Sequence, residues 1–219
     1  MNSPDTVIAA CTASHRRLEA GIAGLTDHQA RQPSLLPGWN IGHLLTHLAR
    51  NADSQIRMFE GAARDEVATQ YVGGAEGRTA DIEAGAGRAA TELIADVTTS
   101  NARLEVTWAE TTERAWAGAG LSLGGELPCA LMPYRRLVET ELHHIDLGRI
   151  GEHEYSFADL PNDFVGLEIR RLTALWASRQ PMGLATLPAT ALELSAQDRL
   201  AWLVGRIDVA GLAPAGVVG

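Results

Sequence analysis

The chain has 219 residues, of which 46% are hydrophobic, and it carries a formal net charge of −9. This length and this hydrophobic content are enough for a full buried core, in one sizeable domain or in one domain with a small appendage. The negative charge, with no basic run longer than an Arg-Arg pair, argues against a nucleic-acid partner and against an anionic membrane surface.

No segment approaches the roughly 20 apolar residues that span a bilayer. Residues 1–17 also lack the basic start and the apolar run of a secretory signal, so we expect a cytoplasmic protein. The two cysteines, Cys11 and Cys129, lie far apart and form no CxxC motif. We expect both to be small buried hydrophobic side chains and to form neither a disulfide framework nor a thiolate zinc site.

The composition predicts a mainly helical chain, because alanine, leucine and arginine dominate and β-branched runs are scarce. We expect a first helix from an N-cap at about Ser3 to about Leu25, with Pro4 in the first turn, where proline is tolerated. A second helix is expected from the N-cap Asn40 to Gly61, because its apolar residues form one broad stripe.

The segment 72–88, VGGAEGRTADIEAGAGR, is rich in glycine, and we expect it to begin as a loop before a third long helix that ends near Thr111. Its glycines match no phosphate-binding fingerprint. A further loop is expected over residues 118–129, followed by a helix that carries residues 133–148. Four long helices joined by loops predict a bundle, in which polar side chains of facing helices converge.

After Gly151 the pattern changes. It predicts a helix over 161–178, two small strands within 184–194, and a final helix that begins at the N-cap Ser195. The predicted fold class is therefore mainly α: a four-helix bundle over residues 1–154 and a small C-terminal α+β domain over residues 155–219.

Two of the expected helices each carry a pair of possible metal ligands one turn apart. Glu139 and His143 have i, i+4 spacing, and so have His43 and His47. His144 points about 100° away from His143 around the helix, so the two cannot easily bind the same ion together with Glu139. Histidine and carboxylate ligands from facing helices form a set that binds divalent transition metals, above all zinc.

The spacing leaves open whether a metal binds and how many ligands hold it. Buried histidines also occur as hydrogen-bonded core residues, and HxxxH arises by chance on helices rich in alanine and leucine. Four ligands would form a closed structural site, whereas three leave a position for water or substrate. A bundle of this size does not need a metal to fold, so an open catalytic or ligand-binding site is the more economical interpretation.

Three segments resemble the motifs of one known family. The segment LPGWNIGHLLTHLARNAD at 36–53 resembles the LPGWxxxHxxxHLAxNA signature of the mycothiol-dependent maleylpyruvate isomerase family, which lies in the wider DinB-like group of metal-binding four-helix bundles. RLVETELHHIDLG at 136–148 resembles the RxxExxxHxxDLG segment of that family, and AWLVGR at 201–206 resembles its WLxGR motif. The resemblance covers essentially the whole chain.

The resemblance implies a zinc site held by His47, Glu139 and His143, with one coordination position open. It also implies that Arg206 is a catalytic, anion-binding group that meets a substrate carboxylate, a task that suits a planar guanidinium.

Four neighbouring residues are expected to have roles other than metal ligand or catalytic group. His43 is left outside the ligand set, as a residue that lines the pocket, and His144 becomes a packing or supporting residue. Asp146 is expected to be a partner on the same helix face. We interpret Trp39 as a packing anchor at the start of the second helix.

The activity implied by the resemblance is the cis–trans isomerisation of maleylpyruvate to fumarylpyruvate, with zinc and the small thiol mycothiol as cofactors. The partners would be a small-molecule thiol and an electrophilic dicarboxylate, and a monomer is the default. Two alternatives stay open: a mycothiol S-transferase that acts on other electrophiles in detoxification or biosynthesis, and a non-catalytic metal-binding bundle.

Overall fold

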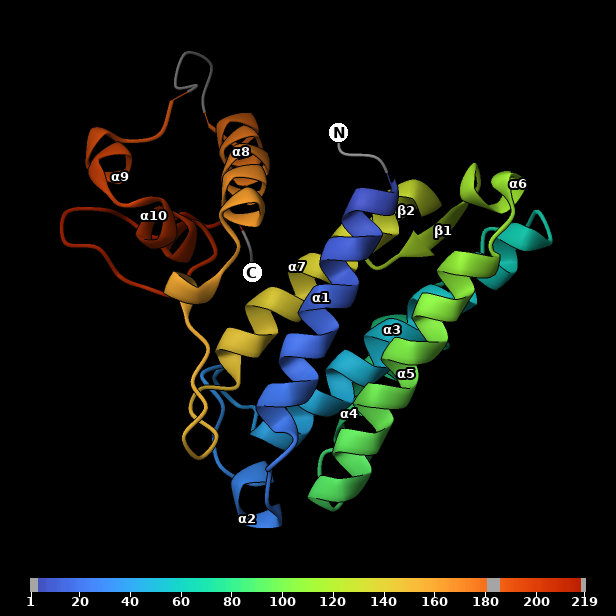
Figure 1. Cartoon of the computed structure of the whole chain (residues 1–219). Coiled ribbons are helices and arrows are strands. Elements are labelled where there is room, and N and C mark those ends of the chain that lie inside the picture. The colour runs from blue at the N-terminus through green and yellow to red at the C-terminus, as the bar shows by residue number, and fades with distance from the viewer. Residues whose placement is uncertain (1–3, 181–185, 218–219) are drawn as a thin grey trace. The chain divides into compact units, whose positions relative to one another are not determined.

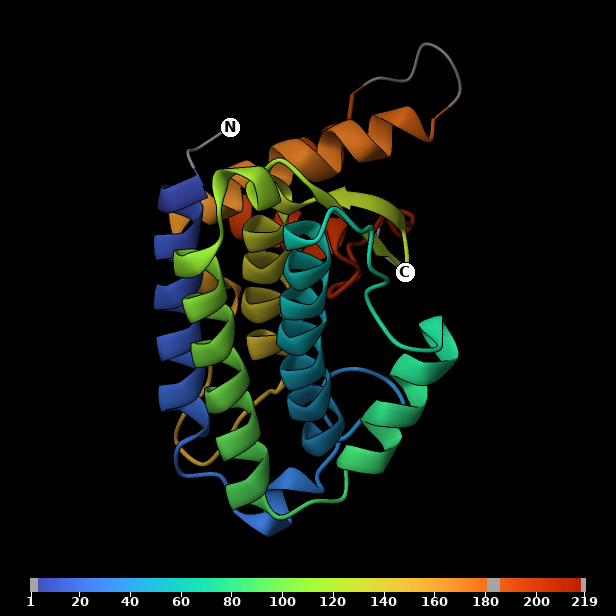
Figure 2. The ribbon, with the colours of Figure 1, turned by 90° about the vertical axis from the view of Figure 1, so that its right-hand side faces the viewer.

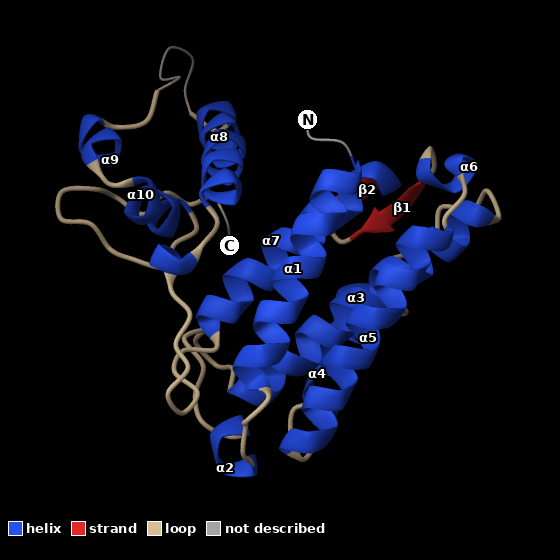
Figure 3. Cartoon of the chain, in the orientation of Figure 1, coloured by secondary structure: helices blue, strands red, loops and turns tan. Residues whose placement is uncertain are grey.

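The computed structural model describes residues 4–180 and 186–217, and most of these residues are helical (Figures 1 and 3). The contacts divide the chain into two compact units, Met1–Tyr155 and Ser156–Gly219. The prediction of a mainly helical chain is confirmed. Within the described ranges, no helix combines the length and the hydropathy that crossing a membrane requires.

Four long helices form the bundle of the first unit: α1 (Pro4–Ile22), α3 (Ile41–Ala63), α5 (Ala90–Glu110) and α7 (Met132–Asp146). Helix α1 contacts α5 and α7, and α3 contacts the same two helices, so the four stand side by side (Figure 2). The predicted four-helix bundle is confirmed. The expected N-cap of the first helix lies outside the described residues, and the helix ends three residues earlier than predicted, at Ile22.

Helix α3 begins as its sequence predicts. The Asn40 side chain accepts a hydrogen bond from the His43 backbone N–H at 2.9 Å, which satisfies one of the free N–H groups of the first turn. The apolar stripe of α3 then faces the other helices. It contributes to a buried aliphatic core whose members include Leu18, Ile22, Leu44, Leu45, Leu48, Leu93 and Val97.

One buried guanidinium links all four bundle helices. Arg136 of α7 is fully buried, and its Nη1 donates to the Leu48 carbonyl and to Asn51 Oδ1, both at 2.8 Å, on α3. Its Nη2 donates to Asn101 Oδ1 of α5 at 2.7 Å, and its Nε donates to His15 Nε2 of α1 at 3.2 Å. Because each nitrogen has a partner, the charge avoids much of the cost of an unpaired buried cation.

The glycine-rich segment is not the loop that the sequence predicts. Residues Gly74–Gly85 form helix α4, which contacts α3 and lies at an angle to it (Figure 2). Close approach explains one glycine of the segment and one on the facing helix: a Cβ at Gly85 would lie 2.5 Å from Thr46 Cγ2, and a Cβ at Gly42 of α3 would lie 2.2 Å from the Ala86 carbonyl oxygen. Here glycine permits backbone contact between helices, and for this reason it misled the prediction.

The second predicted loop, residues 118–129, was also wrong. It contains the antiparallel hairpin of β1 (Ala119–Ser122) and β2 (Gly125–Pro128), with Ala119 opposite Pro128 (Figure 3). The strands have four residues each and few β-branched side chains, so the sequence shows no alternation of apolar and polar residues that would predict them. Short helical turns complete this unit: α2 (Asp27–Ala30), α6 (Glu113–Trp116) and η1 (Cys129–Leu131).

The described part of the second unit is helical. It contains η2 (Phe157–Asp159), α8 (Asn162–Ser178), α9 (Ala189–Glu193) and α10 (Ala196–Leu203). The N-cap Ser195 is confirmed, because its Oγ accepts from the Asp198 N–H at 3.1 Å.

The two strands predicted within 184–194 are wrong where the structure describes them. Residues 184 and 185 lie outside the described ranges, and α9 occupies Ala189–Glu193. The α+β character expected of this unit is therefore absent from its described residues. Pro188 precedes a short ATALE run, and a proline at a helix start followed by alanine and leucine favours a helical turn over a strand.

We expect Arg136→Met to lower the free energy of unfolding by about 3–5 kcal/mol, because it strands several buried hydrogen-bond acceptors. Urea unfolding followed by far-ultraviolet circular dichroism measures the change. Arg103→Met is the control: its side chain is 60% exposed and pairs with Asp53, so a change below about 1 kcal/mol is expected. An equal effect of both substitutions would contradict the central role of Arg136.

Candidate metal centre

The ends of α3 and α7 bring together three of the residues that the sequence analysis selected. The two helices run in opposite directions (Figure 1), so the first turns of α3 lie beside the last turns of α7. Glu139 Oε2 lies 3.0 Å from His47 Nε2 and 3.3 Å from His143 Nε2, and the three ligand atoms all lie within 4.8 Å of one another. We call these residues the His47–Glu139–His143 cluster.

The cluster fits a single small divalent ion. Ligand atoms bound tetrahedrally at about 2.0–2.2 Å are separated by roughly 3.3 Å, and the two shortest separations in the cluster match that value. The His47 side chain is 4% exposed, whereas that of Glu139 is 27% exposed. The cluster is thus buried at His47 and partly accessible at Glu139, which suits an ion with an open coordination position.

Burial and hydrogen bonding give the three groups different charges in the absence of metal. Burial lowers the pKa of His47 to about 4, so this ring is neutral at pH 7. Burial also acts to lower the pKa of His143, but hydrogen bonds to Asp146 and Glu139 outweigh it and raise that pKa to about 9. Burial opposes ionisation of Glu139 as well, yet its bonds with the two imidazoles hold its pKa well below the usual range. The metal-free cluster is a carboxylate between one neutral and one charged imidazole.

The outer nitrogens of the two histidines face different partners. His143 Nδ1 donates to Asp146 Oδ2 at 2.9 Å, as expected for a partner on the same helix face. This bond leaves Nε2 directed at Glu139, the orientation that a metal-binding histidine needs. His47 Nδ1 instead lies 3.2 Å from Nη2 of Arg78, on α4.

Arg78 is the residue of the site that the sequence analysis missed. It lies in the glycine-rich segment that was predicted to begin as a loop, so no predicted helix placed its side chain beside the bundle. The available signal was the helix-forming run AEGRTADIEAG, in which Ile82 is buried and Arg78 is one turn earlier.

The structure does not bring His43 or His144 into the cluster. His43 belongs to the N-terminal capping box of α3 with Asn40, and its Nε2 lies 3.4 Å from Glu83. His144 Nε2 lies 3.0 Å from His153 Nε2, and its ring stacks on Tyr155 with 4.1 Å between centroids. His144 is therefore a packing residue on another face of α7.

Trp39 is a packing anchor, as predicted. It packs against the aliphatic core of the bundle, and its ring centroid lies 5.5 Å from that of His47. Arg206 follows α10 in the C-terminal unit, where its Nη1 donates to the Val204 carbonyl at 2.8 Å.

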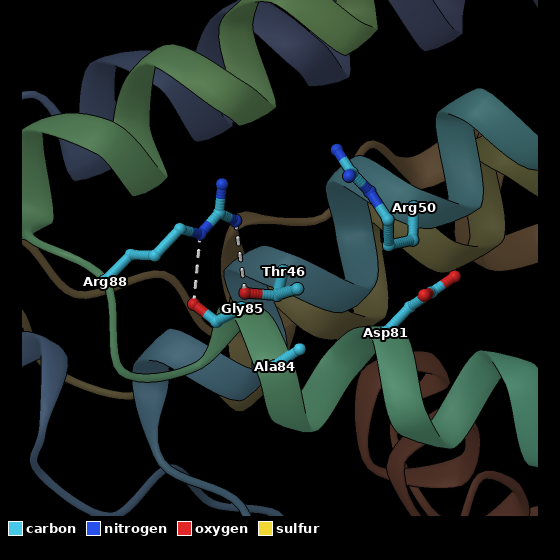
Figure 4. A pocket seen from close by; sticks show the side chains of 6 residues that line it. All are labelled: Thr46, Arg50, Asp81, Ala84, Gly85 and Arg88. Atoms are coloured by element: carbon cyan, nitrogen blue, oxygen red, sulfur yellow. Dashed lines mark hydrogen bonds between the residues drawn. The ribbon is translucent and has the colours of Figure 1, made fainter.

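A pocket of about 300 Å³ between α3 and α4 is lined by Thr46, Asp81 and two arginines, Arg50 and Arg88 (Figure 4). Both arginines donate to Asp96 at 2.6 Å, and the carboxylate of Asp81 adds a further negative charge. The cations of this pocket are already neutralised, so it does not compete with the cluster as the candidate site.

The fold and the cluster together define a DinB-like helical bundle with a candidate metal centre between two of its helices. Residues 11–148 match the family model described as the mycothiol maleylpyruvate isomerase N-terminal domain. This match covers more than half of the chain, so the chain belongs to that family, and membership supports that class of enzyme.

Solved structures agree on the fold. The crystal structure of the mycothiol-dependent maleylpyruvate isomerase is similar with a TM-score of 0.79 and 23% identity, over 93% of this chain and 89% of that chain. A histidine-to-alanine mutant of that isomerase is similar with a TM-score of 0.80 and 22% identity, over the same shares of both chains. No curated protein matches the chain.

We expect replacement of His47, Glu139 or His143 by alanine to remove most of the bound metal while the bundle stays folded, because the apolar core and not the ion stabilises it. Metal analysis after equilibration with zinc, together with circular dichroism, tests this. His28→Ala is the control, because His28 is an exposed histidine outside the bundle helices. A His47→Ala protein that keeps its full zinc content would exclude the cluster as the metal site.

Zinc affinity should rise with pH. The proton on His143 has to leave before Nε2 can bind an ion, and its pKa of about 9 means that the ring is charged at neutral pH. Between pH 6 and pH 8 we expect the dissociation constant to fall about tenfold per pH unit, with one proton released per ion. Competition with a zinc chelator at several pH values measures the slope. A flat profile would show that His143 is neutral in the metal-free protein.

Proposed function

We propose that the chain is a zinc- and mycothiol-dependent isomerase that converts maleylpyruvate to fumarylpyruvate. The observation that carries the proposal is the His47–Glu139–His143 cluster, which has one accessible side, in a chain of this family. The three side chains would hold the ion, and Asp146 would keep the His143 ring in the ligating orientation.

The two cofactors supply the chemistry that the chain lacks. Zinc supplies a Lewis-acidic position that lowers the pKa of a coordinated thiol. Mycothiol supplies the thiolate, whose reversible addition to the cis double bond makes that bond single and free to rotate.

The cysteines of the chain support an external nucleophile. Cys11 and Cys129 are both buried. Burial raises the pKa of the Cys11 thiol far above its usual range, and it raises that of Cys129 to about 11. A thiol, not a thiolate, is therefore present at both positions at neutral pH, and thiols are poor nucleophiles.

The experiment is turnover of maleylpyruvate by the zinc-loaded protein with a small, known amount of mycothiol. An isomerase returns the thiol, so fumarylpyruvate formed should exceed the mycothiol added many times, and free thiol should stay constant. Loss of one thiol per substrate would assign the chain as an S-transferase. No thiol-dependent turnover despite bound zinc would leave the non-catalytic bundle as the remaining function.

We further propose that Arg206 binds a carboxylate of the substrate, on the strength of the AWLVGR segment. A charge-assisted bidentate contact is worth roughly 1.5–3 kcal/mol, so Arg206→Ala should lower kcat/KM by about tenfold to a hundredfold with zinc content unchanged. Arg206→Lys should restore only part, because a point charge cannot reproduce the planar fork. Normal kinetics in Arg206→Ala would return this residue to a purely structural role.

A further inference from the structure

The outer face of the His47 ring has a partner that is unusual for a metal ligand. Its Nδ1 lies 3.2 Å from Nη2 of Arg78. A guanidinium nitrogen can only donate, so Nδ1 accepts this hydrogen bond. A ring nitrogen that accepts carries no proton, so the proton of the ring is on Nε2, which donates to Glu139 Oε2 at 3.0 Å. Arg78 and Glu139 together select this tautomer in the metal-free protein.

A bound ion requires the other tautomer. The ion takes the lone pair of Nε2, so the proton of the neutral ring moves to Nδ1. An Nδ1–H and a guanidinium N–H are both donors, and the 3.2 Å hydrogen bond cannot persist between them. The contrast with His143 is informative, because its outer nitrogen faces the Asp146 carboxylate, an acceptor that suits the loaded state.

Arg78 remains beside the cluster when it leaves His47. Its Cζ lies 5.6 Å from the centroid of the Trp39 ring, a cation–π distance, and the Trp39 ring is itself in contact with His47. Close packing holds its helix in place, because Gly42 and Gly85 allow backbone contact between α3 and the end of α4.

The charge of Arg78 is also free of acidic partners. Among the described residues no carboxylate forms an ion pair with Arg78, whereas Arg50 and Arg88 both pair with Asp96. Arg78 thus differs from the arginines of the neighbouring pocket. A guanidinium that is half-buried, placed by an aromatic ring and unpaired with an acid is suited to bind an anion.

We propose that Arg78 is the anion-binding group of the metal centre: it holds the His47 ring in the metal-free protein and receives a carboxylate of the substrate once the ion is bound. The identity of that substrate as a dicarboxylate rests on the proposed function. A dicarboxylate presents two charges, so this assignment accounts for one carboxylate and leaves the other to a further cation.

The test uses maleate, a cis dicarboxylate, as the probe for zinc-loaded protein in isothermal titration calorimetry. Arg78→Met keeps an apolar stem against Trp39 and removes the charge, and it should weaken maleate binding at least about tenfold. Arg78→Lys should recover part of the affinity. Arg88→Met is the matched control: it removes an arginine that contacts Gly85, Thr46 and Asp96 but none of the cluster (Figure 4), and it should bind maleate like the wild type.

Two readouts separate an anion-binding role from a structural one. The zinc affinity of Arg78→Met should equal or exceed that of the wild type, because the Arg78–His47 bond exists only without the ion. In metal-free protein, nitrogen NMR of the imidazoles should show His47 with its proton on Nε2 in the wild type and a weaker preference for that tautomer in Arg78→Met, where only Glu139 still selects it. A tenfold loss of zinc affinity, or maleate binding that Arg78→Met leaves unchanged, would overturn the proposal. So would an equal loss in Arg88→Met.

Failure of this inference can be told apart from failure of the proposed function. Maleate binding requires neither mycothiol nor turnover. If the wild type does not isomerise maleylpyruvate, the proposed function fails, and the binding comparison still decides the role of Arg78. If the wild type is active and Arg78→Met binds maleate normally, only the role of Arg78 is wrong.

Discussion

The hydrogen bonds of one buried guanidinium constrain the rest of the bundle. Arg136 contacts α1, α3 and α5 from its place on α7, and one of its acceptors is the carbonyl of Leu48, the residue after His47. Glu139 follows Arg136 by three residues on the same helix. The bonds that close the core therefore also fix the register of α3 against α7, and this register decides whether the ligands meet. Hydrophobic packing alone tolerates small sliding of helices, whereas these directional bonds tolerate little.

The cluster is stable without metal for an electrostatic reason. A partly buried carboxylate such as Glu139, with no counter-charge, would lose hydration without compensation. In this chain the proton on His143 supplies the positive charge that an ion would otherwise bring, and Asp146 stabilises that proton. The ligands are therefore held near their binding geometry before an ion arrives, and binding replaces a proton instead of organising a disordered site.

Much of the bundle and the selected cluster could be predicted from the sequence because local rules determine them. Asn40 is a strong N-cap, and the i, i+4 pairs report one helix face. The choice of His47, Glu139 and His143 among the possible ligands came from the family resemblance, because spacing alone left the set open. The failures came where tertiary contact overrides local preference. Gly42 and Gly85 allow close contact between helices, whereas glycine in a sequence suggests a flexible loop. Arg78 was missed because the helix that carries it was not predicted. The prediction for the run ATALE was wrong for a local reason. Its apolar residues predicted a strand, but after Pro188 they form a helical turn.

Helix α4 lies outside the four-helix core, attached to α3 through contacts at its own end. The three candidate metal ligands lie on the core helices, and Arg78, which contacts one of them, lies on this peripheral helix. The candidate ligands and their arginine neighbour thus belong to separate segments. Exposed positions of Gly74–Gly85 can change without disturbing the bonds of Arg136, whereas Arg78 is constrained by its bond to His47 and Gly85 by its close approach to Thr46. For protein engineering, the exposed positions of α4 are therefore the ones to vary, since they leave the bundle core and the cluster intact.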